Sequence, residues 1–140
     1  MSELYTEFDH QHAPIHIIRF TGAQPTDDGF QAYLNGLSAL YEDLSPLAIV
    51  FDAEQGLNIG LRYQRMQADW LKRMDGAMRA YCRGTAYVIK SALVRMTLRA
   101  IFALQPQPAP YKITADRDEA MQWCRDQLAE DTPPAVGSSS

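Results

Sequence analysis

Two carboxylates, Asp52 and Glu54, follow an apolar segment at a spacing of two residues. Carboxylates placed in this way could act as an acid–base pair or hold Mg²⁺. Neither a third oxygen ligand nor a nucleophile occurs at a suitable spacing, so we expect structural carboxylates. Gly56 and Gly60 alone are too weak a signal for a phosphate-binding loop. The sequence therefore predicts no catalytic residues and a protein that is not an enzyme.

Histidines offer the next candidate chemistry. His10 and His12 share one side of an extended segment and could bind a transition metal. With only Asp9 nearby they lack the closed ligand set of a strong site, so we expect a solvated hairpin turn and no metal. His16 lies within an apolar strand, where a core or edge histidine with one hydrogen-bond partner is the simplest interpretation.

Positive charge is concentrated in one stretch of this 140-residue chain. Between Gly60 and Ala100 there are nine Lys and Arg residues and two Asp, a charge of +7 in a chain of net charge −4. Such separation steers a protein partner or an anionic ligand. Nucleic acid is an unlikely partner, because Tyr63, Trp70 and Tyr81 fall on the apolar side of their predicted helix.

Hydrophobic periodicity predicts the elements that position these residues. Strands are expected at residues 4–8, 15–20, 47–51, 84–89 and 111–114. Helices are expected from the N-cap Thr26 to Leu44, over residues 61–81 with Gly76 inside, from the cap Ser91 to Leu104, and from Asp116 through Leu128. The order is ββαβαβαβα. It predicts an α/β fold with a mixed, mostly parallel sheet of about five strands, amphipathic helices and an antiparallel N-terminal hairpin.

Length and composition predict one domain over residues 1–130 and a disordered tail over residues 131–140. Neither a signal-peptide pattern nor an apolar run of about 20 residues is present, so we expect a cytoplasmic protein without a transmembrane segment. The two cysteines, Cys82 and Cys124, are expected to be reduced and buried.

Two segments, QRMQADWLKR at residues 64–73 and CRGTAYVIKSALVRMTLRAIFALQP at residues 82–106, resemble the SpoIIAA-like branch of the STAS superfamily. The similarity extends over residues 14–129. It implies a small α/β domain without a cofactor. Its better-understood members are anti-sigma-factor antagonists, in which a phosphorylated Ser in the loop after a central strand breaks a partner complex. SEC14-like relatives hold lipids.

The loop after the strand at residues 47–51 departs from that pattern. Asp52 matches the acidic residue that opens the motif, but no Ser or Thr occurs between Ser45 and Thr85. The phosphoserine control of the family therefore has no acceptor here, although partner binding remains compatible with the sequence.

The predicted binding site lies beyond the carboxyl ends of the strands at residues 47–51 and 84–89, where ligands gather in open parallel sheets. If these strands are neighbours, side chains from both βα junctions converge and could dock a partner's carboxylate or a ligand's phosphate. The candidates are Asp52, Glu54, Gln55, Asn58, Arg62, Lys90, Ser91 and Arg95. The alternative interpretation is a set of ordinary caps and solvated ion pairs.

The helix at residues 91–104 is apolar nearly all round, which is typical of a helix that is deeply buried or covered by another chain. Arg95, Arg99 and Phe102 are therefore candidates for an oligomer face, with a homodimer as one outcome. A row of Met66, Trp70, Met74 and Met78 could line a lipid pocket, as the SEC14 comparison suggests, but we expect it to be core.

These observations favour a non-enzymatic regulatory or scaffold module that binds a protein partner. The alternative is a carrier or sensor of a lipid or small anionic ligand.

Overall fold

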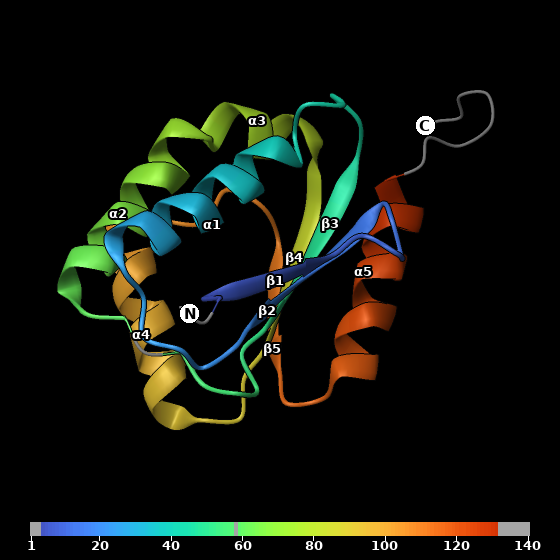
Figure 1. Cartoon of the computed structure of the whole chain (residues 1–140). Coiled ribbons are helices and arrows are strands. Elements are labelled where there is room, and N and C mark those ends of the chain that lie inside the picture. The colour runs from blue at the N-terminus through green and yellow to red at the C-terminus, as the bar shows by residue number, and fades with distance from the viewer. Residues whose placement is uncertain (1–3, 58, 132–140) are drawn as a thin grey trace, which may run out of the picture.

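The structure, a computed structural model, describes residues 4–57 and 59–131. Within them the chain forms one five-stranded sheet with helices on both faces (Figure 1). The strands are β1 (Thr6–Asp9), β2 (Ile15–Phe20), β3 (Leu47–Asp52), β4 (Cys82–Val88) and β5 (Tyr111–Thr114). The helices are α1 (Asp27–Ala39), α2 (Leu61–Arg73), α3 (Asp75–Tyr81), α4 (Ala92–Leu104) and α5 (Arg117–Asp131). The predicted α/β class is confirmed.

The strands lie in chain order, β1-β2-β3-β4-β5. β1 is antiparallel to β2, and the remaining neighbours are parallel, as predicted. Successive parallel connections in this order cross over in the same sense, so they bring α1, α2, α3 and α4 to one face. The last helix, α5, follows β5 and packs on the opposite face (Figure 1).

Two hydrophobic cores result, one on each face of the sheet. The larger contains Ile18 and Ile49 with residues of α1 to α4, and the smaller contains Ile17 and Val50 with residues of α5. Adjacent residues of one strand thus serve opposite cores. This explains why β2 and β3 are apolar on both faces.

The long helix predicted over residues 61–81 is divided at Met74, which has φ −95° and ψ 7°. Hydrogen bonding continues through the break, because the Met74 N–H donates to Trp70 O at 2.9 Å and the Met78 N–H donates to Met74 O at 2.8 Å. The division is a kink that buries Met78. It lies two residues before Gly76, a residue type that weakens the interior of a helix.

Other boundaries shift by a few residues. α1 ends at Ala39 and not at Leu44, which is exposed with φ +52°. β1 begins at Thr6, so Tyr5 precedes the strand and packs in the larger core. β4 begins at Cys82, two residues earlier than predicted.

The predicted helix caps are present. The Thr26 hydroxyl accepts a hydrogen bond from the Gly29 N–H at 3.0 Å, and the Ser91 hydroxyl accepts one from the Val94 N–H at 3.4 Å. At α5, the Asp116 carboxylate accepts from the Asp118 N–H at 2.8 Å. These side chains occupy donors that the first turn of a helix leaves unpaired.

Cys82 and Cys124 are buried free thiols, as predicted. Asp131 belongs to α5, and the rest of the predicted tail lies outside the described residues. None of the described helices is long and apolar enough to cross a membrane.

Candidate functional site

The carboxyl ends of β2, β3, β4 and β5 lie at one edge of the sheet because these strands are parallel. The helices that follow them, α1, α2, α4 and α5, begin at the same edge. We call this edge, with its loops and helix starts, the carboxyl edge. β3 and β4 are direct neighbours, with Asp52 opposite Val88, which is the adjacency that the predicted site required.

Two carboxylates of the predicted site have different roles at the carboxyl edge. Asp52 is 3% exposed, and its Oδ1 accepts a hydrogen bond from the Glu54 N–H at 3.0 Å. Its Oδ2 lies 3.8 Å from Nη1 of Arg117. Glu54 lies nearer the solvent and pairs with Lys90, with 3.2 Å between Oε2 and Nζ. Asp52 therefore fixes the loop backbone, while Glu54 and Lys90 present charge to solvent.

Arg62 pairs with Asp27 at the start of α1 and not with the Glu54–Lys90 pair. Its Nε and Nη2 donate to the two carboxylate oxygens at 3.1 and 2.9 Å, and the Tyr63 hydroxyl donates to Oδ1 at 2.8 Å. The hydrogen bonds from Arg62 and then from Tyr63 lower the pKa of Asp27. Arg62 reaches Asp27 because β2 and β3 are adjacent, which brings the beginnings of α1 and α2 together.

The remaining predicted residues take local roles. Ser91 caps α4, and Nη2 of Arg95 donates to Ile89 O at 3.4 Å. Gly22 has φ +90°, and a Cβ there would lie 3.0 Å from the Gln55 carbonyl oxygen, so glycine allows the two loops to approach. Asn58 lies outside the described residues.

Arg117 is a member of the carboxyl edge that the sequence interpretation missed. It opens α5, the helix after β5, and approaches Asp52 from there. The available signal was its position directly after the last parallel strand, because every such helix begins at this edge.

His10 and His12 are exposed beside the turn of the hairpin, as predicted. The hydrogen-bond partner expected for His16 is His10, with 2.9 Å between their Nδ1 atoms, because β1 and β2 form a hairpin. Burial and the neighbouring His10 lower the pKa of His16. No group of three or more His, Cys, Asp or Glu side chains suited to a metal occurs among the described residues.

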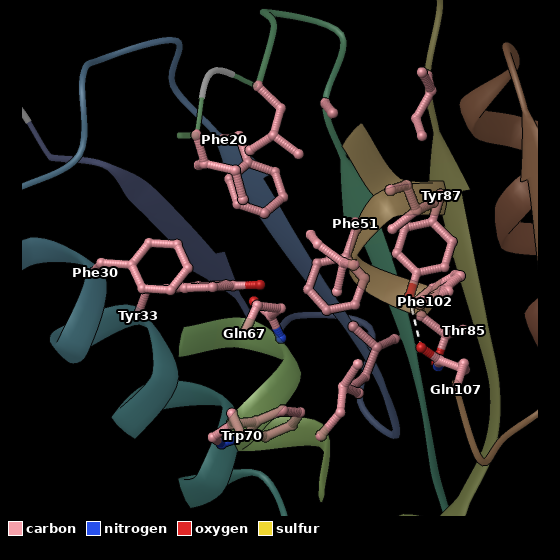
Figure 2. A pocket seen from close by; sticks show the side chains of 18 of the residues that line it. Phe20, Phe30, Tyr33, Phe51, Gln67, Trp70, Thr85, Tyr87, Phe102 and Gln107 are labelled. Carbon is pink, nitrogen blue, oxygen red and sulfur yellow. Dashed lines mark hydrogen bonds between the residues drawn. The ribbon is translucent and has the colours of Figure 1, made fainter. Parts of the chain in front are cut away.

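An apolar cavity lies between the larger-core face of the sheet and helices α1, α2 and α4 (Figure 2). Its volume is about 50 Å³. Phe20, Phe51 and Tyr87 form a stacked row on the sheet side, with ring centroids 6.1 and 5.2 Å apart. Phe30 and Tyr33 close one end, and Phe102 lies at the other beside Tyr87 (Figure 2).

Most polar groups at the Tyr87 end of the cavity bond to one another. The Tyr87 hydroxyl donates to Gln107 Oε1 at 2.9 Å, and Gln107 Nε2 donates to Thr85 Oγ1 at 3.0 Å (Figure 2). Tyr5 also lines the cavity, and its hydroxyl is buried without a hydrogen-bond partner among the described residues. Trp70 and Met78 of the predicted row line the cavity and belong to the core.

The predicted oligomer face divides between the inside and the outside of the protein. Phe102 turns inward and lines the cavity, whereas Arg99 is exposed and Arg95 is half-buried. The large exposed apolar side chains of α4 are Leu93, Met96 and Leu104.

A mixed sheet in chain order, with four helices on one face and one on the other, is the small α/β fold expected from the SpoIIAA-like resemblance. Among solved structures, the crystal structure of an anti-sigma factor antagonist from Mycobacterium paratuberculosis has this fold, with a TM-score of 0.54 and 16% sequence identity. The alignment covers 86% of this chain and 93% of that chain. No family model matches the chain, and no curated protein matches it. The predicted small α/β fold is confirmed, and the anti-sigma factor antagonist shares it.

Proposed function

We propose that the protein is a regulatory module that binds another protein, of the kind an anti-sigma factor antagonist acts on, through its carboxyl edge. The observation that carries this proposal is the shared fold, which extends over nearly the whole of both domains. A binding function is also compatible with the absence of a metal-ligating cluster among the described residues.

The Glu54–Lys90 pair supports the location of this partner site. Both charges lie near solvent, where an ion pair contributes little to stability. A partner can therefore replace either member of the pair at small energetic cost. Asp52 lies beneath the pair and accepts a hydrogen bond from the Glu54 N–H, which holds the backbone of the loop that carries Glu54.

The proposed complex is not controlled by phosphorylation of a Ser or Thr in the β3–α2 loop. The sequence has no Ser or Thr between Ser45 and Thr85, and this interval includes the whole β3–α2 loop. Regulation at this loop therefore needs another input.

A charge reversal at Lys90 tests the partner site. Lys90→Glu places two acidic groups side by side at the carboxyl edge, and we expect loss of the partner that co-purifies with the protein from its own host. Arg79→Glu is a matched control, because the Lys90 and Arg79 side chains are similarly exposed, at 62% and 65%. Arg79 lies in α3, which leads into the start of β4 at the end of the sheet away from the carboxyl edge. Arg62 is a poorer target because its reversal disrupts the contact with Asp27.

The expected result is a complex that survives Arg79→Glu and is lost with Lys90→Glu, both variants showing the wild-type circular dichroism spectrum. A complex that persists with Lys90→Glu would contradict the proposed site. A homodimer and a cytoplasmic location stay predictions from the sequence.

The second candidate function is a carrier or sensor of a lipid or small anionic ligand, and the apolar cavity is the place where we would expect such a ligand to bind. Its lining contains no charged side chain among the described residues. Since an unpaired charge is unfavourable in an apolar interior, the cavity fits a neutral ligand better than an anion.

A further inference from the structure

We propose that the outer face of helices α2 and α4 docks on an anionic lipid surface. This inference goes beyond the proposed partner site, which lies at the carboxyl edge, and does not depend on it. It rests on an exposed apolar stripe of α4, on cations beside that stripe and on the charge of the opposite face of the protein.

α4 is apolar on its outer side as well as on its inner side, which packs in the larger core. On the outer side Leu93 is 70% exposed, Met96 63% and Leu104 49%. These residues fall at i, i+3 and i+11, so they form one stripe along the helix, and Ala100 is an exposed residue of the same stripe. A helix that is apolar nearly all round is normally covered on all sides.

The stripe lies on the side of α4 that is turned toward α2. The opposite side of α4 meets β5, because the Phe102 ring contacts the Tyr111 ring with 5.2 Å between centroids. Leu93 and Leu104 are roughly 180–200° from Phe102 around the helix. They therefore border α2, against which α4 packs (Figure 1).

α2 adds charged residues along this border. Its Tyr63 and Trp70 donate hydrogen bonds to side chains of α1, so that side of α2 faces α1. A residue two positions away lies about 200° around the helix. Leu61, Arg65 and Lys72 thus lie toward α4, and all three are exposed. We call the resulting surface the α2–α4 face; it consists of Leu61, Arg65, Lys72, Leu93, Met96, Arg99, Ala100 and Leu104.

The cations of the α2–α4 face have no acidic partner. Arg65, Lys72 and Arg99 form no ion pair with any described residue. Asp69 is the single acidic residue of α2, and α4 has none. A second copy placed symmetrically on this face would bring the same cations together. Charge complementarity therefore calls for an anionic occupant.

The residue types favour a lipid surface over an acidic protein. Hot spots of protein interfaces are rich in Trp, Tyr and Arg, whereas Leu is under-represented there and Lys is depleted from interfaces. The α2–α4 face has leucine, methionine and lysine and no aromatic residue. Apolar side chains flanked by cations are typical of a helix that lies in the interface of an anionic membrane. In this arrangement the apolar stripe enters the acyl boundary and the cations stay among the headgroups.

The other face of the sheet has the charge that this orientation requires. α5 packs there, and its described side chains expose four carboxylates and two guanidinium groups. The carboxylates belong to Asp118, Glu119, Asp126 and Glu130. An anionic surface repels this side and attracts the other, so the field of the whole protein turns the α2–α4 face toward the lipid.

Vesicle sedimentation tests the proposal on the full chain. The probe is a large vesicle of equimolar phosphatidylglycerol and phosphatidylcholine, compared with a vesicle of phosphatidylcholine alone. We expect binding to the first and little to the second. Binding should weaken between about 50 and 500 mM NaCl, because salt screens the attraction between exposed charges.

Two pairs of variants separate the apolar and the charged contributions. Leu93→Gln should weaken binding roughly 10- to 100-fold, the range for burial of a leucine side chain. Its control is Leu44→Gln, the same change at a residue that is 67% exposed and follows α1 at the other end of the sheet. Arg65→Gln should weaken binding about fivefold, and Arg125→Gln, a control in the exposed surface of α5, should not.

All four variants should keep the wild-type circular dichroism spectrum, because glutamine is nearly as good a helix former as leucine and arginine. The proposal is overturned if the wild type does not bind the phosphatidylglycerol vesicles at low salt, or if Leu93→Gln binds them as tightly as Leu44→Gln does. It is also overturned if sedimentation velocity shows a dimer that Leu93→Gln dissociates, since a second copy would then cover this face. Loss of a host protein in Leu93→Gln without any vesicle binding would assign the face to a protein partner instead.

Discussion

Replacing Tyr5 by phenylalanine should stabilise the ligand-free protein, although most substitutions of buried residues destabilise. The change removes one oxygen and keeps the ring and its packing against Phe20, Phe30 and Tyr33. Burial raises the pKa of the Tyr5 hydroxyl, so the group is neutral and only its missing hydrogen bond matters.

The magnitude follows from that missing bond. A buried unsatisfied polar group destabilises by about 1–3 kcal/mol. We expect the free energy of unfolding to rise by about 1 kcal/mol in Tyr5→Phe. With an unfolding entropy of about 2.1 cal/mol/K per residue, the midpoint temperature should rise by roughly 3–4 °C.

Tyr87→Phe is the matched control, since it makes the same chemical change on the same cavity. The Tyr87 hydroxyl donates to Gln107 Oε1 at 2.9 Å, and its removal leaves that half-buried acceptor without its donor. We expect a loss of about 1–2 kcal/mol. The two substitutions should therefore have opposite signs.

Urea unfolding followed by circular dichroism measures both variants, with the m-value unchanged from wild type. A loss of stability in Tyr5→Phe comparable to that in Tyr87→Phe would show that the Tyr5 hydroxyl has a partner in the folded protein. That result would refute the reasoning.

Two further predictions concern packing and pH. Gly84→Ala should lower the free energy of unfolding by about 1–3 kcal/mol, because its Cβ would lie 2.8 Å from the Trp123 ring. Gly76→Ala has open space around its Cβ and should raise the free energy of unfolding by up to about 1 kcal/mol. Thermal unfolding of both variants measures the difference. Because the folded-state pKa of His16 is lowered, its contribution to stability is complete above about pH 6.5 and declines as the pH falls through the folded-state pKa. Urea midpoints at pH 7.5 and 5.5 should show this decline, and His10→Asn should reduce it in part; an unchanged midpoint would contradict it.

The ion pairs of the carboxyl edge show the limit of sequence-based prediction. Adjacency of β3 and β4 could be predicted, because buried strands alternating with amphipathic helices favour sequential parallel pairing. The partner of Arg62 could not, since it depends on how α1 begins beside α2. Asp27 is 35 residues away in the chain and no periodicity links the two.

The cavity also could not be predicted from the sequence. Its lining residues come from strands, helices and loops of the whole chain, and each of them taken alone has the signature of ordinary core. The unpaired hydroxyl of Tyr5 is visible only when every neighbour of that atom is known. A void or an unsatisfied atom is a property of the packed neighbourhood and not of any residue within it.

The sequence by itself determined the succession of elements, the caps Thr26 and Ser91, and the absence of a hydroxyl acceptor in the loop after β3. Each depends on neighbours within a few residues, where backbone geometry and side-chain chemistry act directly. Tertiary packing alone decided that Lys90 meets Glu54, that Arg117 approaches Asp52, and that Tyr5 lines a cavity. These contacts join segments distant in the chain, and their distances follow from how helices of fixed length and side chains of fixed volume fit against the sheet.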